Sequence, residues 1–213
     1  MKRIFLVFVC LILAALLAAE VTYIDSLRQK ADAGDAEAQY NLGVCYNYGA
    51  LVVQDYKVAV SWYRLAAEQG YASAQNSLGN RYYNGEGVAK DLKKAVKWFR
   101  LAADQGDASA QYNLGVYYHN GEGGTKDYKE AVKWYRLAAE QGHAESQFSL
   151  GIYYGAGTGV VQDYSEAYFW CLLAAANGSD KAKEGRDLAA KELTPQRREQ
   201  IQVRAQKWFE EHR

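Results

Sequence analysis

The sequence has few of the residues that interrupt helices, cross-link a chain or bind metals. Its 213 residues include one proline, three cysteines and three histidines, and 25 basic side chains are balanced by 25 acidic ones. With so little proline, long stretches can remain helical. Zero net charge removes the electrostatic footprint of a nucleic-acid-binding protein, so we expect no nucleic-acid partner. An apolar fraction of 49% excludes an intrinsically disordered chain.

One long apolar run is present, and it lies at the amino end. Lys2 and Arg3 precede the sixteen apolar residues 4–19, a pattern typical of a secretory signal peptide and shorter than the roughly 20 residues that span a bilayer. We therefore expect residues 1–19 to be a signal peptide of an exported protein, periplasmic or secreted. A leucine stands where a small residue is preferred before the cleavage site. An uncleaved inner-membrane anchor through residues 4–19, facing the periplasm, thus stays open as the alternative.

A period of 36 residues organises most of the remaining chain. Leu42-Gly43 recurs three times at this interval without any insertion. The positions that keep the register include Leu42, Leu78, Leu114 and Leu150; Trp62, Trp98, Trp134 and Trp170; Asp55, Asp91, Asp127 and Asp163; and Gly70, Gly106, Gly142 and Gly178. We place a capping helix at residues 20–34, four repeats at residues 35–70, 71–106, 107–142 and 143–178, and capping helices at residues 179–213.

Each repeat reads as two helices joined by a loop. In the first helix of repeat one, Ala38, Leu42 and Tyr46 form a single apolar stripe. Gly43 lies inside this helix, where glycine costs about 1 kcal/mol relative to alanine. Its recurrence in every repeat therefore predicts a neighbouring helix too close for a side chain.

The second helix has its own start and stop signals. Asp55 is at the position of an N-cap, and Gly70 is at the position just beyond the helix end. Repeat one has Leu51 where repeats two to four have glycine, so we expect its loop to differ locally. The buried face of the second helix is expected to comprise Ala59, Trp62, Tyr63, Ala66 and Ala67.

The last part of the chain carries signals for two more helices. The stretch at 180–193 has polar residues in place of Leu-Gly and is expected to be a polar-faced cap, as the end of a repeat array requires. Thr194-Pro195 is an N-cap followed by proline at the first helical position. The helix after it is expected to place Ile201, Ala205 and Trp208 on one face.

Two cysteines remain after removal of residues 1–19, and the same cut leaves 23 basic and 25 acidic side chains. Exported proteins often pair their cysteines. However, Cys45 and Cys171 lie several repeats apart, which exceeds the reach of a disulfide. We expect both to be buried free thiols.

The repeat resembles a known family. The pattern A-x-A-Q-x-x-L-G-x-x-Y, then G-x-G-V-x-x-D, then A-x-x-W-Y-R-x-A-A-x-x-G is similar to the Sel1-like repeat (SLR) family, a 36-residue relative of the tetratricopeptide repeat, over residues 35–178. This resemblance implies an all-α fold, a right-handed α/α solenoid of helix-turn-helix repeats with helical caps at both ends. It also implies a protein–protein interaction scaffold or adaptor, here in the bacterial cell envelope. Some relatives carry a disulfide in every repeat, and this chain lacks those cysteine pairs.

The sequence contains no catalytic constellation, so we expect no enzyme activity, no cofactor and no metal. Some exported relatives are linked to β-lactam binding, and a β-lactam-hydrolysing cell-envelope enzyme is therefore the alternative. No serine has lysine three residues later, the spacing that such serine enzymes use. The three histidines, His119, His143 and His212, have no metal-binding spacing. We expect His119 to be a surface residue in a loop region.

In related tetratricopeptide arrays the first helices line a concave groove, and the varied positions of these helices are the candidate partner site. They contain no lysine or arginine in the four repeats, so a clamp for a terminal carboxylate is not expected. The candidate groove residues for a protein or peptide partner are Tyr40, Asn76, Asn80, Tyr83, Asn84, Tyr112, His119, Asn120 and Phe148.

Three of these residues, Asn76, Asn80 and Asn84, lie at helical spacing and form an amide ladder. Amides donate and accept together, as the backbone of an extended peptide requires. An ordinary solvated helix face is the other interpretation, and the sequence leaves both open. We expect Asn80 and Tyr112 to point away from the core between repeats.

Overall fold

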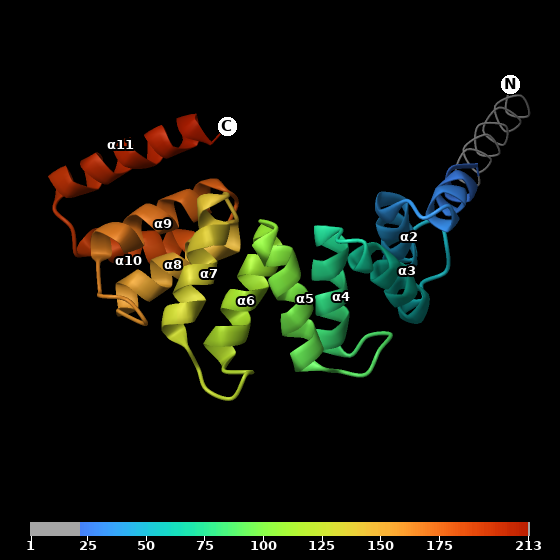
Figure 1. The fold of residues 1–213 in the computed structure, drawn as a ribbon. Coiled ribbons are helices and arrows are strands. Elements are labelled where there is room, and N and C mark those ends of the chain that lie inside the picture. The colour runs from blue at the N-terminus through green and yellow to red at the C-terminus, as the bar shows by residue number, and fades with distance from the viewer. Residues whose placement is uncertain (1–21, 213) are drawn as a thin grey trace, which may run out of the picture. The chain divides into compact units, whose positions relative to one another are not determined.

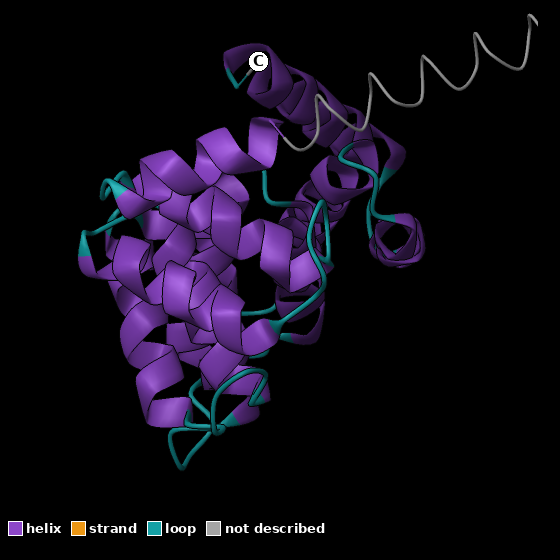
Figure 2. Cartoon of the chain, turned by 90° about the vertical axis from the view of Figure 1, so that its right-hand side faces the viewer, coloured by secondary structure: helices purple, strands orange, loops and turns teal. Residues whose placement is uncertain are grey.

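The computed structural model describes residues 22–212, and the regular structure in that part of the chain is entirely helical (Figures 1 and 2). The signal peptide or anchor expected at residues 1–19 lies outside the described residues. Contacts between Cα atoms divide the chain into two compact units, Met1–Ala95 and Val96–Arg213. The boundary falls inside helix α5 (Leu92–Asp104).

The first unit contains a helix over residues 22–32, then α2 (Ala36–Tyr48), α3 (Tyr56–Glu68) and α4 (Ala72–Asn84). Helix α2 packs against α3, and α3 packs against α4. One core cluster joins the helix over residues 22–32 to α2. It is made of Ile24, Leu27, Ala31, Ala38, Leu42 and Cys45.

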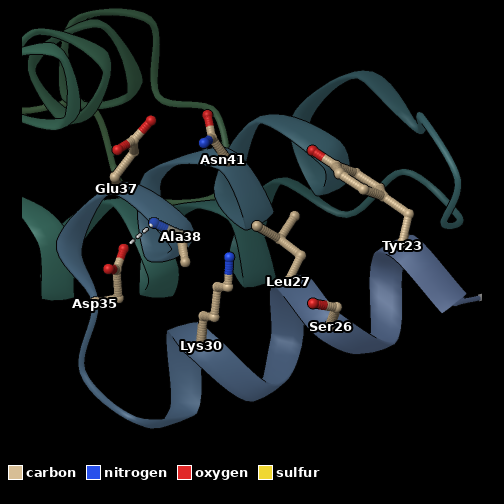
Figure 3. A pocket seen from close by; sticks show the side chains of 8 residues that line it. All are labelled: Tyr23, Ser26, Leu27, Lys30, Asp35, Glu37, Ala38 and Asn41. Atoms are coloured by element: carbon tan, nitrogen blue, oxygen red, sulfur yellow. Dashed lines mark hydrogen bonds between the residues drawn. The ribbon is translucent and has the colours of Figure 1, made fainter.

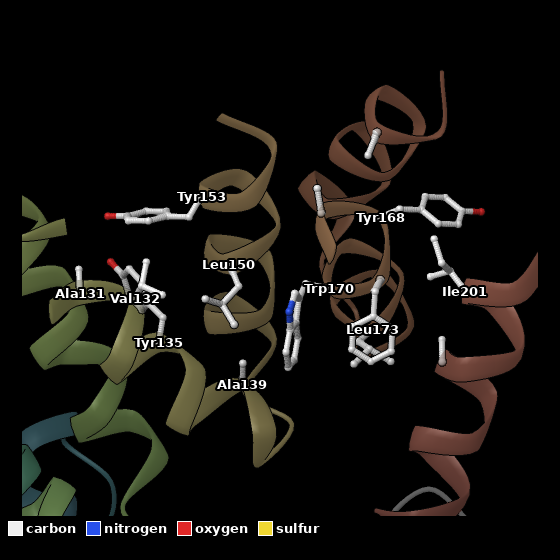
Figure 4. Packing of buried hydrophobic residues seen from close by; sticks show 14 residues of the cluster. Ala131, Val132, Tyr135, Ala139, Leu150, Tyr153, Tyr168, Trp170, Leu173 and Ile201 are labelled. Carbon is white, nitrogen blue, oxygen red and sulfur yellow. The ribbon is translucent and has the colours of Figure 1, made fainter. Parts of the chain in front are cut away.

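The second unit contains α6 (Ala108–Asn120), α7 (Tyr128–Glu140), α8 (Ala144–Ala156), α9 (Tyr164–Ala176), α10 (Asp180–Lys191) and α11 (Pro195–Glu211). From α6 to α10 each helix packs against the next, and α11 packs against α9. Figure 4 shows the core of this unit, with Leu150 and Trp170 between helices and Ile201 reaching in from α11. The helix-pair architecture expected from the repeat is therefore confirmed.

The predicted ends of individual helices are formed by the expected N-cap and C-terminal residues. Asp55 accepts hydrogen bonds from the backbone N–H groups of Lys57 and Val58 at 2.8 and 3.1 Å. Gly70, just beyond the end of α3, has φ of +91°, a conformation that favours glycine. At the start of α11, Thr194 accepts from the N–H of Arg197, and proline occupies the first turn.

The helix glycines lie where another helix comes close. A Cβ added to Gly43 would be 2.6 Å from the ring of Tyr63 in α3. Gly115 faces the ring of Tyr135 in the same way, and Gly151 faces the sulfur of Cys171. The expected close approach is confirmed, and it explains why these helix positions exclude a side chain.

A buried glutamine links each repeat to the helix before it. The side chain of Gln39 is 5% exposed and donates to the carbonyl of Ala31, eight residues earlier, at 3.1 Å. Because a buried amide without a partner is unfavourable, the glutamine fixes the last turn of one helix against the next first helix. The same contact recurs from Gln75 to Ala67, from Gln111 to Ala103 and from Gln147 to Ala139.

The buried face of the second helix differs from the sequence expectation at one position. Ala59, Tyr63, Ala66 and Ala67 are buried as expected, whereas the indole of Trp62 is half-buried. On a helical projection Trp62 lies at the edge of the stripe formed by the other four, so one side of its ring meets solvent. Its equivalents Trp98 and Trp134 are also half-buried, and Trp170 is buried.

Candidate functional site

In the first unit, the candidate residues lie on the first helices α2 and α4. Tyr40 is half-buried, with its ring 5.8 Å from that of Tyr63 and 5.3 Å from that of Tyr71. Tyr83 is half-buried and Lys90 approaches its ring at 5.6 Å. These tyrosines are therefore held by neighbours within the protein and are only partly open to a partner.

The amide ladder is less open than its spacing indicates. Asn84 is exposed, whereas Asn76 and Asn80 are half-buried and each takes part in an interaction within the protein. Asn47, at another position of the same face, is buried with 6% exposure. Part of the face that the periodicity alone assigns to a groove is thus covered within the protein.

In the second unit, Tyr112 does not point away from the core. Its half-buried ring stacks on that of His143 at 5.0 Å, lies 5.8 Å from that of Tyr135 and packs against the core cluster. The expectation from the sequence was wrong here, because the turn between α7 and α8 brings His143 over this side of α6.

His119 is also placed differently from the sequence expectation. It lies in the last turn of α6, half-buried, with Nδ1 2.5 Å from the hydroxyl of Tyr153 in α8. Helix α6 continues to Asn120, so His119 belongs to a helix and is not in a loop. Asn120 is exposed and donates to Glu122 at 3.0 Å. These two candidates therefore contribute one interior contact and one exposed amide.

The carboxyl-terminal half of α8 borders an open apolar pocket, here called the α8–α10 pocket. Its volume is about 340 Å³. Two large aliphatic side chains in its lining, Ile152 and Leu188, are 46% and 62% exposed. Phe148 is half-buried against Gly185 of α10, near the pocket. The lining comprises Gly151, Ile152, Gly155, Ala156, Tyr164, Ala167, Gly185, Leu188, Ala189, Lys191 and Glu192.

The α8–α10 pocket lies where small residues replace the larger ones of the other repeats. Gly155 and Ala156 occupy the register of His119 and Asn120, and Gly185 and Ala189 line α10. Sequence reasoning did not select this pocket. The signal that would have found it is this run of small residues beside Leu188, an exposed leucine in a helix expected to be polar-faced.

A second, more polar pocket lies in the first unit, between the helix over residues 22–32 and α2 (Figure 3). Its volume is about 320 Å³. Lys30 points into it, across from Asp35 and Glu37. Asp35 is engaged as the N-cap of α2, accepting from the N–H of Ala38 at 2.7 Å. This polar pocket is lined by Tyr23, Ser26, Leu27, Lys30, Asp35, Glu37, Ala38 and Asn41.

The described residues contain no cluster of His, Cys, Asp and Glu side chains suited to a metal ion. Cys45 and Cys171 are buried and free, as expected. Burial raises the pKa of the Cys171 thiol to about 11, so little thiolate forms at neutral pH. None of the helices in residues 22–212 combines the length and apolarity that a bilayer crossing requires.

The sequence model of the Sel1 repeat matches residues 36–71, 72–107, 108–143 and 144–179. The chain therefore belongs to the Sel1 repeat family. Proteins of this family typically mediate protein–protein interactions, and the repeat is generally a non-catalytic scaffold. No finding supports the alternative of a β-lactam-hydrolysing enzyme.

Solved structures agree with this assignment. One similar structure is c5321, a protective antigen of uropathogenic Escherichia coli with an SLR fold, at 47% identity and a TM-score of 0.72, covering 75% of this chain and 34% of that one. Another is a Sel1 repeat protein from Oxalobacter formigenes, at 39% identity and a TM-score of 0.64, covering 70% of this chain and 61% of that one. The aligned part thus spans about a third and three fifths of these relatives. None of the curated proteins compared with the sequence matches it.

Proposed function

We propose that this protein is a non-catalytic adaptor that binds a segment of a partner protein on its first-helix face. The first-helix face comprises, in each unit taken by itself, the positions equivalent to Tyr40, Val44 and Tyr48 in the first helices and in α10. The observation that carries the proposal is the α8–α10 pocket, since Ile152 and Leu188 both occupy the Val44 position. Concave, mostly apolar pockets are the usual form of a ligand-binding site.

The proposal places the adaptor in the cell envelope. Residues 1–19 act as the export signal, and the chain works in the periplasm or outside the cell. Mass spectrometry of the amino terminus tests this in cells that express the full chain. A mature start near Glu20 is expected for the released form, and an intact start at Met1 or Lys2 would show an anchored adaptor instead.

Site-specific photo-crosslinking tests the binding face. A photoreactive amino acid is placed at Ile152 or at Asn120, both exposed on the first-helix face, and at Lys97, exposed on second helix α5 of the same unit. Partner crosslinks are expected from the first two positions and not from Lys97. Crosslinks from Lys97 alone would show that the partner uses the second helices and would contradict the proposal.

A further inference from the structure

The α8–α10 pocket combines features that narrow the chemistry of its occupant, provided that the proposed binding function holds. Its lining is rich in glycine and alanine, and its apolar side chains Ile152 and Leu188 are 46% and 62% exposed to water. A volume of about 340 Å³ is at the lower end for ligand pockets. This space suits one or two large side chains of a polypeptide.

The mouth of the pocket is acidic in balance. Gly155 and Ala156 are the last residues of α8, and Lys191 is the last residue of α10, so two helix carboxyl ends meet at the pocket. Each such end carries roughly half an elementary negative charge. Glu192 adds a full negative charge at the rim, and Lys191 offsets one unit. A basic group of the occupant is therefore favoured beside the apolar one.

We infer that the α8–α10 pocket takes a large aliphatic or aromatic side chain of the partner segment, directly next to a lysine or arginine. The apolar side chain removes Ile152 and Leu188 from water, which is the main driving force. The neighbouring cation lies at the ends of α8 and α10 beside Glu192. The pocket thus sets which segment of a partner is bound.

Short peptides test this chemistry on the chain of residues 20–213. The probe is the capped, fluorescein-labelled peptide Ser-Leu-Arg-Ser-Gly, compared with one having Ser for Leu and one having Glu for Arg. Fluorescence anisotropy is expected to show affinity at least tenfold lower without Leu and at least threefold lower with Glu. In ¹⁵N-labelled protein, the probe is expected to shift the amide signals of Gly151, Gly155 and Gly185.

Matched variants locate the binding. Ile152→Ser and Leu188→Ser replace exposed walls of the pocket, so both proteins are expected to fold, and each is expected to weaken the Leu-Arg peptide at least fivefold. Leu137→Ser replaces a leucine of similar exposure, 44%, on α7 outside the pocket, and is expected to leave the affinity unchanged. Equal effects of all three substitutions would overturn the inference.

The remaining outcomes separate the inference from the proposed function. Equal binding of the Ser and Leu peptides, or tighter binding of the Glu peptide, overturns the inference. Peptide-induced shifts at Tyr112 and Asn120 without shifts at the pocket glycines also overturn it, while binding on the first-helix face stands. If the same glycine signals move with protein concentration alone, the occupant is a second copy of the chain and the inference is wrong.

Discussion

At the scale of single residues, two glycines of α8 allow the cost of overpacking to be measured apart from the gain in helix propensity. A Cβ at Gly151 would overlap the sulfur of Cys171, whereas a Cβ at Gly155 would be 3.7 Å from that of Ala167, an ordinary contact. Overpacking costs roughly 1–3 kcal/mol, and replacing helical glycine with alanine gains about 1 kcal/mol. We expect Gly151→Ala to destabilise the protein by about 1–2 kcal/mol and Gly155→Ala to stabilise it by up to about 1 kcal/mol in urea unfolding.

The cause of the Gly151 effect can be checked within the same contact. Cys171→Ala removes the sulfur that the new methyl group would overlap. The two substitutions together are therefore expected to be less destabilising than the sum of the single changes, since neighbouring sites couple. An additive result would place the strain elsewhere.

Leu51 is held in a conformation that favours glycine. Its φ is +66°, close to the +73° and +69° of Gly87 and Gly159 at the equivalent positions. The left-handed region costs a residue with a side chain roughly 1–2 kcal/mol, and Leu51 is 44% exposed, so little burial is lost with its side chain. Leu51→Gly is expected to raise the free energy of unfolding by about 1 kcal/mol. Ala50→Gly, in the same loop without positive φ, should not stabilise, and a gain from it would contradict this account.

We expect His143 to make the stability of the protein depend on pH. It is the N-cap of α8, and its Nδ1 accepts from the N–H of Ser146 at 3.3 Å. Burial lowers the pKa of His143 below its ordinary value of 6.5, although Glu145, 3.6 Å away, acts in the opposite direction. The unfolded chain therefore binds a proton more readily than the folded one, and stability is lost as the pH falls below 6.5.

The measurement is urea unfolding at neutral pH and at roughly pH 5, above and below the ordinary pKa of a histidine. His143→Asn keeps a side-chain acceptor for the cap and does not titrate. We expect this variant to lose less stability on acidification than the wild type. Equal losses in both proteins would assign the acid sensitivity to other groups.

At the scale of helices, α9 and α11 form a pair that differs from the rest of the array. Helix α9 carries Phe169 and Leu172 where α7 carries Lys133 and Arg136. A helix that is apolar on all sides is buried, and α11 covers this side of α9, with Arg204 3.7 Å from the ring centre of Phe169 and paired with Glu166. Ile201 and Ala205 of α11 are buried against the cluster in Figure 4.

Removal of α11 is therefore expected to expose an apolar surface and cause aggregation. A chain that ends at Leu193 should elute as aggregates in size-exclusion chromatography. Adding Phe169→Lys and Leu172→Arg gives α9 the outer residues of α7 and should restore a monodisperse protein. If the truncated chain stays monodisperse without these changes, α11 does not act as the cover of α9.

The helix pairs themselves could be predicted from the sequence because each signal is local or periodic. Asp55, Gly70 and Thr194 mark helix ends by the chemistry of their own backbone, and Gly43 recurs at one register. Trp62 was expected to be buried but is half-buried, because periodicity gives the direction of a helix face and not how much of that face neighbouring helices cover. Tyr112 was expected to point away from the core, and this was wrong because its neighbour His143 comes from the next helix pair.

At the scale of the molecule, the α8–α10 pocket shows what one repeat cannot reveal. It is lined by Ile152 from α8, Ala167 from α9 and Leu188 from α10, with Gly155 and Gly185 between them in the lining. The 36-residue period places these residues at known positions of the repeat, but the volume of the pocket depends on the distance between its helices. The register of these residues could therefore be predicted from the sequence, whereas the pocket between their helices could not.

A repeat array is expected to respond to damage locally, because its stability is close to a sum of repeat and nearest-neighbour contributions. Gly43→Ala forces a methyl group against Tyr63 in the first unit, and Gly151→Ala forces one against Cys171 in the second. Native-state hydrogen exchange reports the opening of each segment separately. We expect Gly43→Ala to lower protection mainly in α2 and α3, and Gly151→Ala mainly in α8 to α10, each leaving the other unit close to wild type. If either substitution lowers protection by the same factor in both units, the chain unfolds as one cooperative body and the additive description does not hold.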